Sequence, residues 1–128
     1  MKRIVFILLI AAFFFGCEKE KPIEYSSSLI GEWEWLSTCG GFSGLCSTPK
    51  TTKSAGKLVF NQDSMFYEYR NNSLISSYEF SILKTPADNH TFGFLLINDR
   101  NYLYTIYHDT LNFMIEGADF ASMYKRIK

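Results

Sequence analysis

The sequence predicts an all-β fold, either a barrel or a sandwich of short antiparallel strands. Three observations support this prediction. Runs rich in aromatic and β-branched residues alternate with turn residues at intervals of roughly 8–12 residues. No segment after residue 28 keeps the apolar period of about 3.6 residues that marks an amphipathic helix. The chain contains 12 Phe and 8 Tyr, which are residue types favoured in strands.

Residues 1–16 have the composition of a secretory signal peptide. Lys2 and Arg3 are followed by 12 residues, 4–15, without a polar side chain. A helix of this length extends about 18 Å, whereas a membrane-spanning helix needs roughly 20 apolar residues. We therefore expect residues 1–16 to direct export and to be removed.

Cys17 ends this apolar segment in the sequence Phe14-Phe15-Gly16-Cys17. The sequence resembles a lipobox, in which the cysteine thiol receives diacylglycerol and, after cleavage, its amine receives an acyl chain such as palmitate. Phe14 and Phe15 depart from the usual Leu and the usual Ala or Ser. Two or more acyl chains anchor a protein stably. We expect a cell-envelope lipoprotein attached through Cys17 to the outer membrane, facing the periplasm or the surface. The alternative is an ordinary signal peptide with a coincidental cysteine.

The part of the chain after the signal peptide has the size of one domain. Its 112 residues carry 11 basic and 13 acidic side chains, without a basic patch, so we expect no nucleic-acid partner. Residues 17–28 begin with charged residues and are expected to form a flexible tether. Residues 29–128 are expected to form the folded domain.

Cys39 and Cys46 are predicted to form a disulfide. Export places both in an oxidising compartment, and three glycines between them let the chain turn back sharply. A metal or redox pair is the alternative, and it is disfavoured because six residues separate the cysteines and no His lies near them.

The strands are expected to number eight and to be joined by turns of hairpin length. A long loop rich in glycine and threonine, which reaches Gly56, separates the first two strands. The predicted strands are residues 29–37, 57–60, 64–70, 74–83, 91–97, 101–108, 110–115 and 120–127.

Alternation with a period of two predicts which side chains share a face of each strand. Tyr78, Phe80 and Ile82 are expected on one face, and so are Leu111, Phe113 and Ile115 on a later strand. The last strand places Phe120, Ser122, Tyr124 and Arg126 together. Residues 92–97 and 101–107 are apolar on both faces, which suggests that something covers the outer face there. Glu32, Glu34 and Glu68 are interpreted as lying on a solvated outer face, with paired carboxylates as the disfavoured alternative.

Residues 29–127 resemble the lipocalin-like lipoproteins of certain Gram-negative bacteria. The resemblance rests on Leu29-Ile30-Gly31-Glu32-Trp33, on the strand Lys57-Leu58-Val59-Phe60 and on Met123-Tyr124-Lys125-Arg126. In lipocalins a Gly-x-Trp motif opens the first strand, and a late basic residue packs over the Trp at the closed end of the barrel. The resemblance assigns these places to Gly31, Trp33 and Arg126. It implies an eight-stranded antiparallel up-and-down barrel of the lipocalin-like type.

The sequence shows no arrangement of residues that indicates catalysis, so we expect no enzymatic activity. His90 and His108 lack nearby cysteines or spaced carboxylates, and we expect no metal and no cofactor. Ser, His and Asp residues are present, but not in a nucleophile-elbow motif.

Two binding functions remain as hypotheses. An eight-stranded barrel can hold one small apolar or amphipathic ligand, although plain packing of aromatic side chains is an equal alternative. The second hypothesis is a protein-binding module, for example an inhibitor of lysozyme or another hydrolase, that inserts the Cys39–Cys46 loop into its partner. Phe42 and Leu45 lie near the tip of this loop, and a loop folded over the barrel mouth would instead act as a lid. The candidate ligand-binding residues are Tyr67, Tyr69, Tyr78, Phe80, Tyr104, Phe113 and Tyr124.

Overall fold

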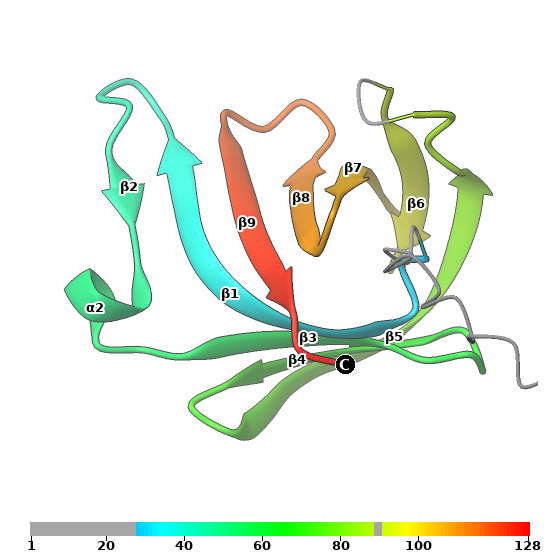
Figure 1. Ribbon diagram of the computed structural model, residues 1–128, viewed down its shortest axis with the longest axis horizontal. Helices are drawn as coiled ribbons and strands as arrows, with labels where there is room; N and C mark the ends of the chain where they lie inside the picture. The colour runs from blue at the N-terminus through cyan, green and yellow to red at the C-terminus, as the bar shows by residue number, and fades with distance from the viewer. Residues whose placement is uncertain (1–27, 89–90) are drawn as a thin grey trace, which may run out of the picture.

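Eight antiparallel strands close into a barrel in the computed structural model, which describes residues 28–88 and 91–128. Each of these strands pairs with the next along the chain, and pairing of the first with the last closes the barrel (Figure 1). The predicted all-β fold and its eight-stranded up-and-down arrangement are confirmed. The strands are β1 (Gly31–Gly40), β3 (Gly56–Phe60), β4 (Met65–Arg70), β5 (Ser73–Lys84), β6 (Gly93–Ile97), β7 (Arg100–Tyr107), β8 (Thr110–Ile115) and β9 (Phe120–Arg126).

The segment between β1 and β3 differs from the long loop that was predicted. It contains a two-residue strand, β2 (Cys46–Ser47), and one helical turn, α2 (Pro49–Thr52). The turn is held by reciprocal capping, because the Thr48 hydroxyl accepts from Thr51 N and the Thr51 side chain accepts from Thr48 N. The capping pattern of Thr48 and Thr51, with Pro49 at the first helical position, is the sequence signal for this turn.

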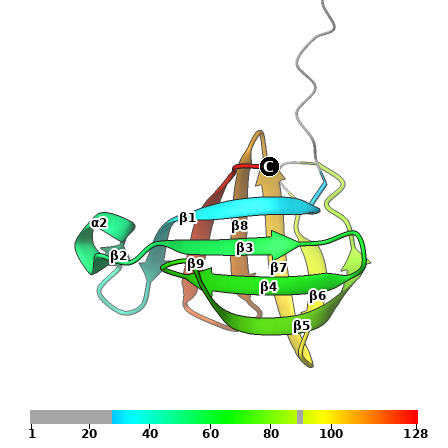
Figure 2. The ribbon, with the colours of Figure 1, turned by 90° about the horizontal axis from the view of Figure 1, so that it is seen from below.

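The strand β1 also extends three residues beyond its predicted end at residue 37. Its pairing with β9 shifts register between Trp35 and Ser37, and this irregularity breaks the alternation that the prediction followed. The long strands β1 and β5 curve, so that β3 and β4 cross the direction of β7, β8 and β9 (Figure 1, Figure 2).

The two ends of the barrel differ, and they are named here by their turns. The closed end contains segment 28–30 and the turns at 61–64 and 108–109, whereas the open end contains segment 41–55 and the turns at 71–72, 98–99 and 116–119. At the open end β1 separates from β3. Residues 31–34 of β1 pair with β3, but Thr38 and Cys39 pair with β2 instead. The barrel wall is therefore split between β1 and β3 at this end.

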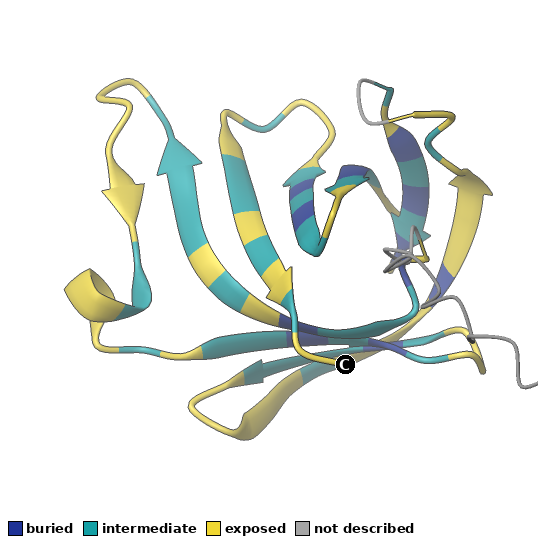
Figure 3. Ribbon diagram, in the orientation of Figure 1, coloured by how far each residue is buried: buried dark blue, intermediate teal, exposed yellow. Residues whose placement is uncertain are grey.

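The hydrophobic core is centred on Phe60. Its ring centroid lies 5.1 Å from that of Phe66, 5.2 Å from that of Phe80 and 6.1 Å from that of Phe113. Figure 3 shows the buried positions along the inner barrel, whereas β2, α2 and the β4–β5 turn are exposed. The buried apolar side chains are Leu29, Trp33, Leu58, Phe60, Phe66, Phe80, Leu95, Ile97, Tyr104, Leu111 and Phe113.

Several predictions fall on residues whose structure is not described. The signal peptide at 1–16, lipid on Cys17, nearly all of the tether at 17–28 and His90 lie outside the described residues and stay predictions. Within residues 28–88 and 91–128, no helix has the length and apolar character needed to cross a membrane.

Candidate functional site

Trp33 and Arg126 seal the closed end of the barrel. They are directly paired on β1 and β9, the two strands whose pairing closes the wall. Trp33 is fully buried, and the guanidinium carbon of Arg126 lies 4.2 Å from its ring centroid. The indole Nε1 donates a hydrogen bond to the Leu29 carbonyl oxygen at 2.9 Å. The predicted contact between a buried Trp33 and Arg126 is confirmed.

Arg126 also ties the segment before β1 to the barrel. Its Nη1 donates to the Ile30 carbonyl oxygen at 3.1 Å and its Nη2 donates to the Ser28 carbonyl oxygen. Its Nε lies 3.5 Å from Oδ1 of Asp109. Burial lowers the pKa of Arg126, and the charge of Asp109 opposes this shift. Arg126 thus binds both the segment 28–30 and the turn at Asp109 while its guanidinium lies over the Trp33 ring.

Gly31 is required by the same arrangement. Its φ is +146°, and a Cβ atom there would collide with the Lys128 carbonyl oxygen and with Arg126 Nη1. The Gly-x-Trp spacing therefore has a local physical cause. Because Gly31 has no Cβ, the Lys128 carbonyl and the Arg126 guanidinium can lie against it. Trp33, two residues later on the same face of β1, lies under that guanidinium.

The open end contains a cavity of about 430 Å³ inside the barrel, here called the mouth cavity. Its walls combine core rings with hydroxyl groups and one carboxylate, contributed mainly by β4, β5, β7, β8 and β9. The lining residues are Leu58, Phe66, Glu68, Ser76, Tyr78, Ile97, Asn98, Arg100, Tyr102, Phe113, Met114, Ile115, Ala118, Phe120, Ser122 and Tyr124.

A second cavity, of about 420 Å³, lies where the wall is split between β1 and β3 and is called the side cavity. It shares Leu58, Glu68, Ser122 and Tyr124 with the mouth cavity, so the two cavities meet at these side chains. Its other lining residues are Trp35, Thr38, Thr52, Ser54, Ala55, Gly56, Lys57, Tyr69 and Arg70.

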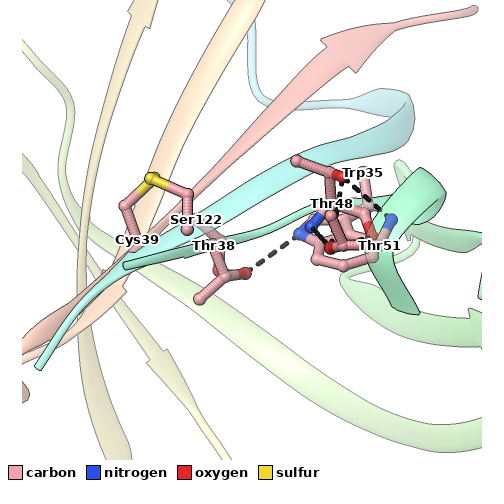
Figure 4. The surroundings of a disulfide bond; sticks show 7 residues. Trp35, Thr38, Cys39, Thr48, Thr51 and Ser122 are labelled. Atoms are coloured by element: carbon pink, nitrogen blue, oxygen red, sulfur yellow. Dashed lines mark hydrogen bonds between the residues drawn. A yellow bond between two sulfur atoms is a disulfide. The ribbon is translucent and has the colours of Figure 1, made fainter. Parts of the chain in front are cut away.

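A chain of hydrogen bonds crosses from β1 to β9 at this meeting point. Trp35 Nε1 donates to Thr38 Oγ1 at 2.9 Å, and Thr38 Oγ1 lies 2.7 Å from Ser122 Oγ (Figure 4). Ser122 in turn hydrogen-bonds the Tyr124 side chain. These groups hold the two strands together beside the split wall, where β1 has left β3.

Burial raises the pKa of Tyr124 to about 12, and the negative charge of Glu68 adds to the rise. The hydrogen bond from Ser122 opposes it. Burial also raises the pKa of Tyr102, where Arg100 opposes the shift and Glu68 adds to it. Both phenols are neutral at physiological pH, and both lie within the electrostatic range of Glu68.

Glu68 itself lies inside the barrel, which corrects the prediction of a solvated outer face. It is two residues from the buried Phe66, so both side chains point inward, and it lines both cavities. Within the described part of the chain, its carboxylate makes no hydrogen bond and no ion pair. The Phe66-x-Glu68 alternation was the sequence signal for this placement.

The predicted ligand-binding residues are distributed over four environments. Tyr78, Phe113 and Tyr124 line the mouth cavity. Tyr69 lines the side cavity, with its ring 4.8 Å from Lys57 Nζ. Tyr67 lines neither cavity, because it alternates with the inward Phe66 and Glu68 and so points to the outer face of β4. Phe80 and Tyr104 belong to the core. Sequence reasoning did not select Trp35, Tyr102 or Ser122, although Tyr102 shares a face with the selected Tyr104.

The predicted disulfide between Cys39 and Cys46 is confirmed (Figure 4). The two residues are paired across β1 and β2, with their Cα atoms 4.1 Å apart. The hairpin between them projects from the barrel (Figure 1), Phe42 is fully exposed and Leu45 is 74% exposed. Neither side chain lines the mouth cavity or the side cavity, so the hairpin does not act as a lid.

No protein-family model matches this chain, and no curated protein is significantly similar to it in sequence. The fold and the two ends of the barrel define a class: a closed antiparallel β-barrel with one sealed end and one hollow, aromatic end. Function is therefore argued from the geometry of the open end.

Proposed function

We propose that this chain is a lipid-anchored envelope protein whose barrel binds a small apolar or amphipathic molecule at its open end. The observation that supports binding is the mouth cavity. Its volume of about 430 Å³ falls within the range of roughly 300–1,000 Å³ that is typical of small-molecule sites. Its walls combine apolar side chains and polar groups in about equal measure, which suits an amphipathic molecule.

Three further observations fit this proposal. The contact of Trp33 with Arg126 fills the barrel interior near the closed end, so a ligand of the mouth cavity would enter by the open end or through the split wall. The Gly31, Trp33 and Arg126 arrangement agrees with the resemblance to lipocalin-like lipoproteins. The polar groups in the cavity are mainly hydroxyls, a single carboxylate and a rim arginine, with no His among the lining residues, which favours binding over catalysis. The anchor is the lipid predicted on Cys17.

The experiment compares two tryptophan substitutions on neighbouring residues. Ser76 lines the mouth cavity, whereas Ser77 is exposed on the other face of β5. We expect Ser76→Trp to fill the cavity and Ser77→Trp to leave it open. Each protein is purified from envelopes, and its organic extract is analysed by mass spectrometry. A compound that accompanies the wild type and Ser77→Trp but not Ser76→Trp would support the proposal. Identical extracts from all three proteins would contradict it.

A second candidate function is protein binding through the disulfide hairpin. Phe42 and Leu45 favour it, because both are largely exposed on the projecting hairpin and a partner that covered them would remove their apolar surface from water. The Cys39–Cys46 bond limits the freedom that the hairpin would lose on docking. Inhibition of lysozyme is the direct assay. A Phe42→Ser, Leu45→Ser variant should lose inhibition and keep small-molecule binding, whereas absence of inhibition by the wild type would exclude that target.

A further inference from the structure

The place where the mouth and side cavities meet contains a carboxylate without a partner. Glu68 is partly buried and lines both cavities. The carboxylate oxygens of Glu68 are accessible rather than buried. In the described residues this carboxylate forms no ion pair and no hydrogen bond. A bound group of opposite charge can therefore reach it from the cavities and pair with it, and a partly enclosed site strengthens such a pair.

Aromatic rings surround the same position. Tyr102 stacks on Phe113 with centroids 4.8 Å apart and planes inclined by 6°. Tyr124 meets Phe113 edge-on with a centroid distance of 6.4 Å. Glu68 lines the mouth cavity together with these three rings, and its charge contributes to the raised pKa of both Tyr102 and Tyr124. Ring faces attract organic cations, and neutral phenol oxygens can accept hydrogen bonds from them.

The chemistry of the walls selects among cations. A single carboxylate offers too few ligands for Ca²⁺, which takes 6–8 oxygens, or for the near-octahedral site of Mg²⁺. The remaining lining includes Leu58, Phe66, Ile97 and Ile115, which suit an apolar body. An organic ammonium group joined to an apolar skeleton satisfies both parts of the cavity.

We propose that the open end binds an amphipathic amine, with its ammonium group on Glu68 among Tyr102 and Tyr124 and its apolar body in the mouth cavity. This inference rests on the proposed small-molecule function of the same site and adds the chemical class of the ligand. Three cationic side chains line the cavities with it: Lys57, Arg70 and Arg100. Lys57 is partly buried and lies over the Tyr69 ring, whereas the two arginines are exposed, and in the described residues none of the three forms an ion pair with Glu68. The charges of Arg70 and Arg100 are screened by solvent more strongly than the charge of Glu68.

The test uses three probes with one naphthalene body and different heads: naphthylethylamine, naphthylethanol and naphthylacetate. The full chain is placed in phosphatidylcholine vesicles, binding is measured by equilibrium dialysis, and protein-free vesicles are subtracted. A charge-assisted hydrogen bond in a partly buried site corresponds to roughly tenfold to hundredfold in affinity. We expect the wild type to bind the amine more tightly than the alcohol by this factor.

Two variants test whether Glu68 causes the preference for the amine over the alcohol. Glu68→Gln keeps the shape of the side chain and removes its charge, so the amine and the alcohol should bind about equally. Glu79→Gln is the matched control, because Glu79 is exposed on β5 and lines neither cavity. It should keep the full preference. The comparison of probes on the wild type is informative even if Glu68→Gln fails to fold.

The outcomes separate this inference from the broader proposal. Equal binding of amine and alcohol by the wild type would overturn the role of Glu68 and leave small-molecule binding supported. Tightest binding of naphthylacetate, lost in Arg100→Gln, would overturn it by showing that the rim arginine selects the ligand. If none of the probes binds, the amine proposal is overturned. If, in addition, the Ser76→Trp comparison of envelope extracts shows no difference, the proposed function fails as well.

Discussion

Replacing Trp33 with alanine should remove a large part of the stability of the barrel. The indole is fully buried, its Nε1 satisfies the Leu29 carbonyl, and its ring lies 4.2 Å from the Arg126 guanidinium carbon. Large-aromatic deletions in cores cost about 3–5 kcal/mol. The upper part of that range, about 4–5 kcal/mol, is expected because Trp33→Ala also leaves a carbonyl without its donor and a partly buried cation without its ring. A domain of this size has roughly 5–15 kcal/mol in total.

The assay is urea denaturation followed by far-UV circular dichroism and by the fluorescence of the remaining tryptophan. Trp33→Phe keeps an aromatic ring under Arg126 and loses the N–H donor, so about 1–2 kcal/mol is expected. Trp35→Ala is the matched control, because Trp35 is only partly buried in the wall of the side cavity. It should cost clearly less than Trp33→Ala. A loss below about 1 kcal/mol for Trp33→Ala, with an unchanged m value, would refute the role assigned to the closed end.

Three further predictions test other parts of the chain. The pKa of Tyr124 is about 12 in the folded state and about 10 in the unfolded state. Between these pH values the folded state binds more protons than the unfolded state. The contribution of Tyr124 to the free energy of unfolding is therefore complete below pH 10 and is lost as the pH rises through 12. Tyr124→Phe should reduce that alkaline loss by about 2 kcal/mol at pH 12 in urea denaturation, and an unchanged pH profile would contradict the burial of the phenol. Reduction of Cys39–Cys46 should cost about 2–3 kcal/mol by the chain-entropy estimate and leave the strand signal in circular dichroism; loss of the strand signal would show that the bond maintains the barrel itself. Cys17→Ser should abolish incorporation of radiolabelled palmitate, and equal labelling of wild type and variant would exclude the lipid anchor.

Much of the fold was predictable because hairpin-connected strands leave local signals. The predicted strand 110–115 has the bounds of β8, and the others agree within three residues at each end. The exceptions have physical causes. The register shift after Trp35 breaks the alternation on which the prediction of β1 depended. The pairing of Cys46 and Ser47 with β1 is created by chain reversal at the disulfide, and no two-residue segment carries such a signal alone.

The site was predictable only in part. The contact at the closed end was predicted from the resemblance of the Gly31 and Trp33 motif to lipocalins, and the structure supplies its local cause, a clash at Gly31 and a ring contact at Trp33. The open end was not predicted, because β4 alternates Phe66 and Glu68 with Tyr67 and Tyr69, and tyrosines are the more usual cavity residues. The buried Phe66 decides the orientation, and Glu68 follows it inward. The split between β1 and β3 depends on where a strand exchanges partners, which no local pattern encodes.

The sites of the two candidate functions, the cavities and the disulfide hairpin, lie next to each other, and both functions could operate in one molecule. The hairpin that exposes Phe42 begins directly after Cys39, and the neighbouring Thr38 carries the hydrogen bonds that link Trp35 to Ser122 across the split wall. A partner that held the hairpin would therefore also hold Thr38 at the edge of the side cavity, because the disulfide joins the two strands of the hairpin next to this residue. The sealed end would be unaffected, since the Trp33 and Arg126 contacts lie at the opposite end of β1. Ligand affinity measured with the disulfide intact and reduced separates these cases. Dependence on the disulfide would indicate one coupled site, and independence would indicate a cavity and a hairpin that work separately.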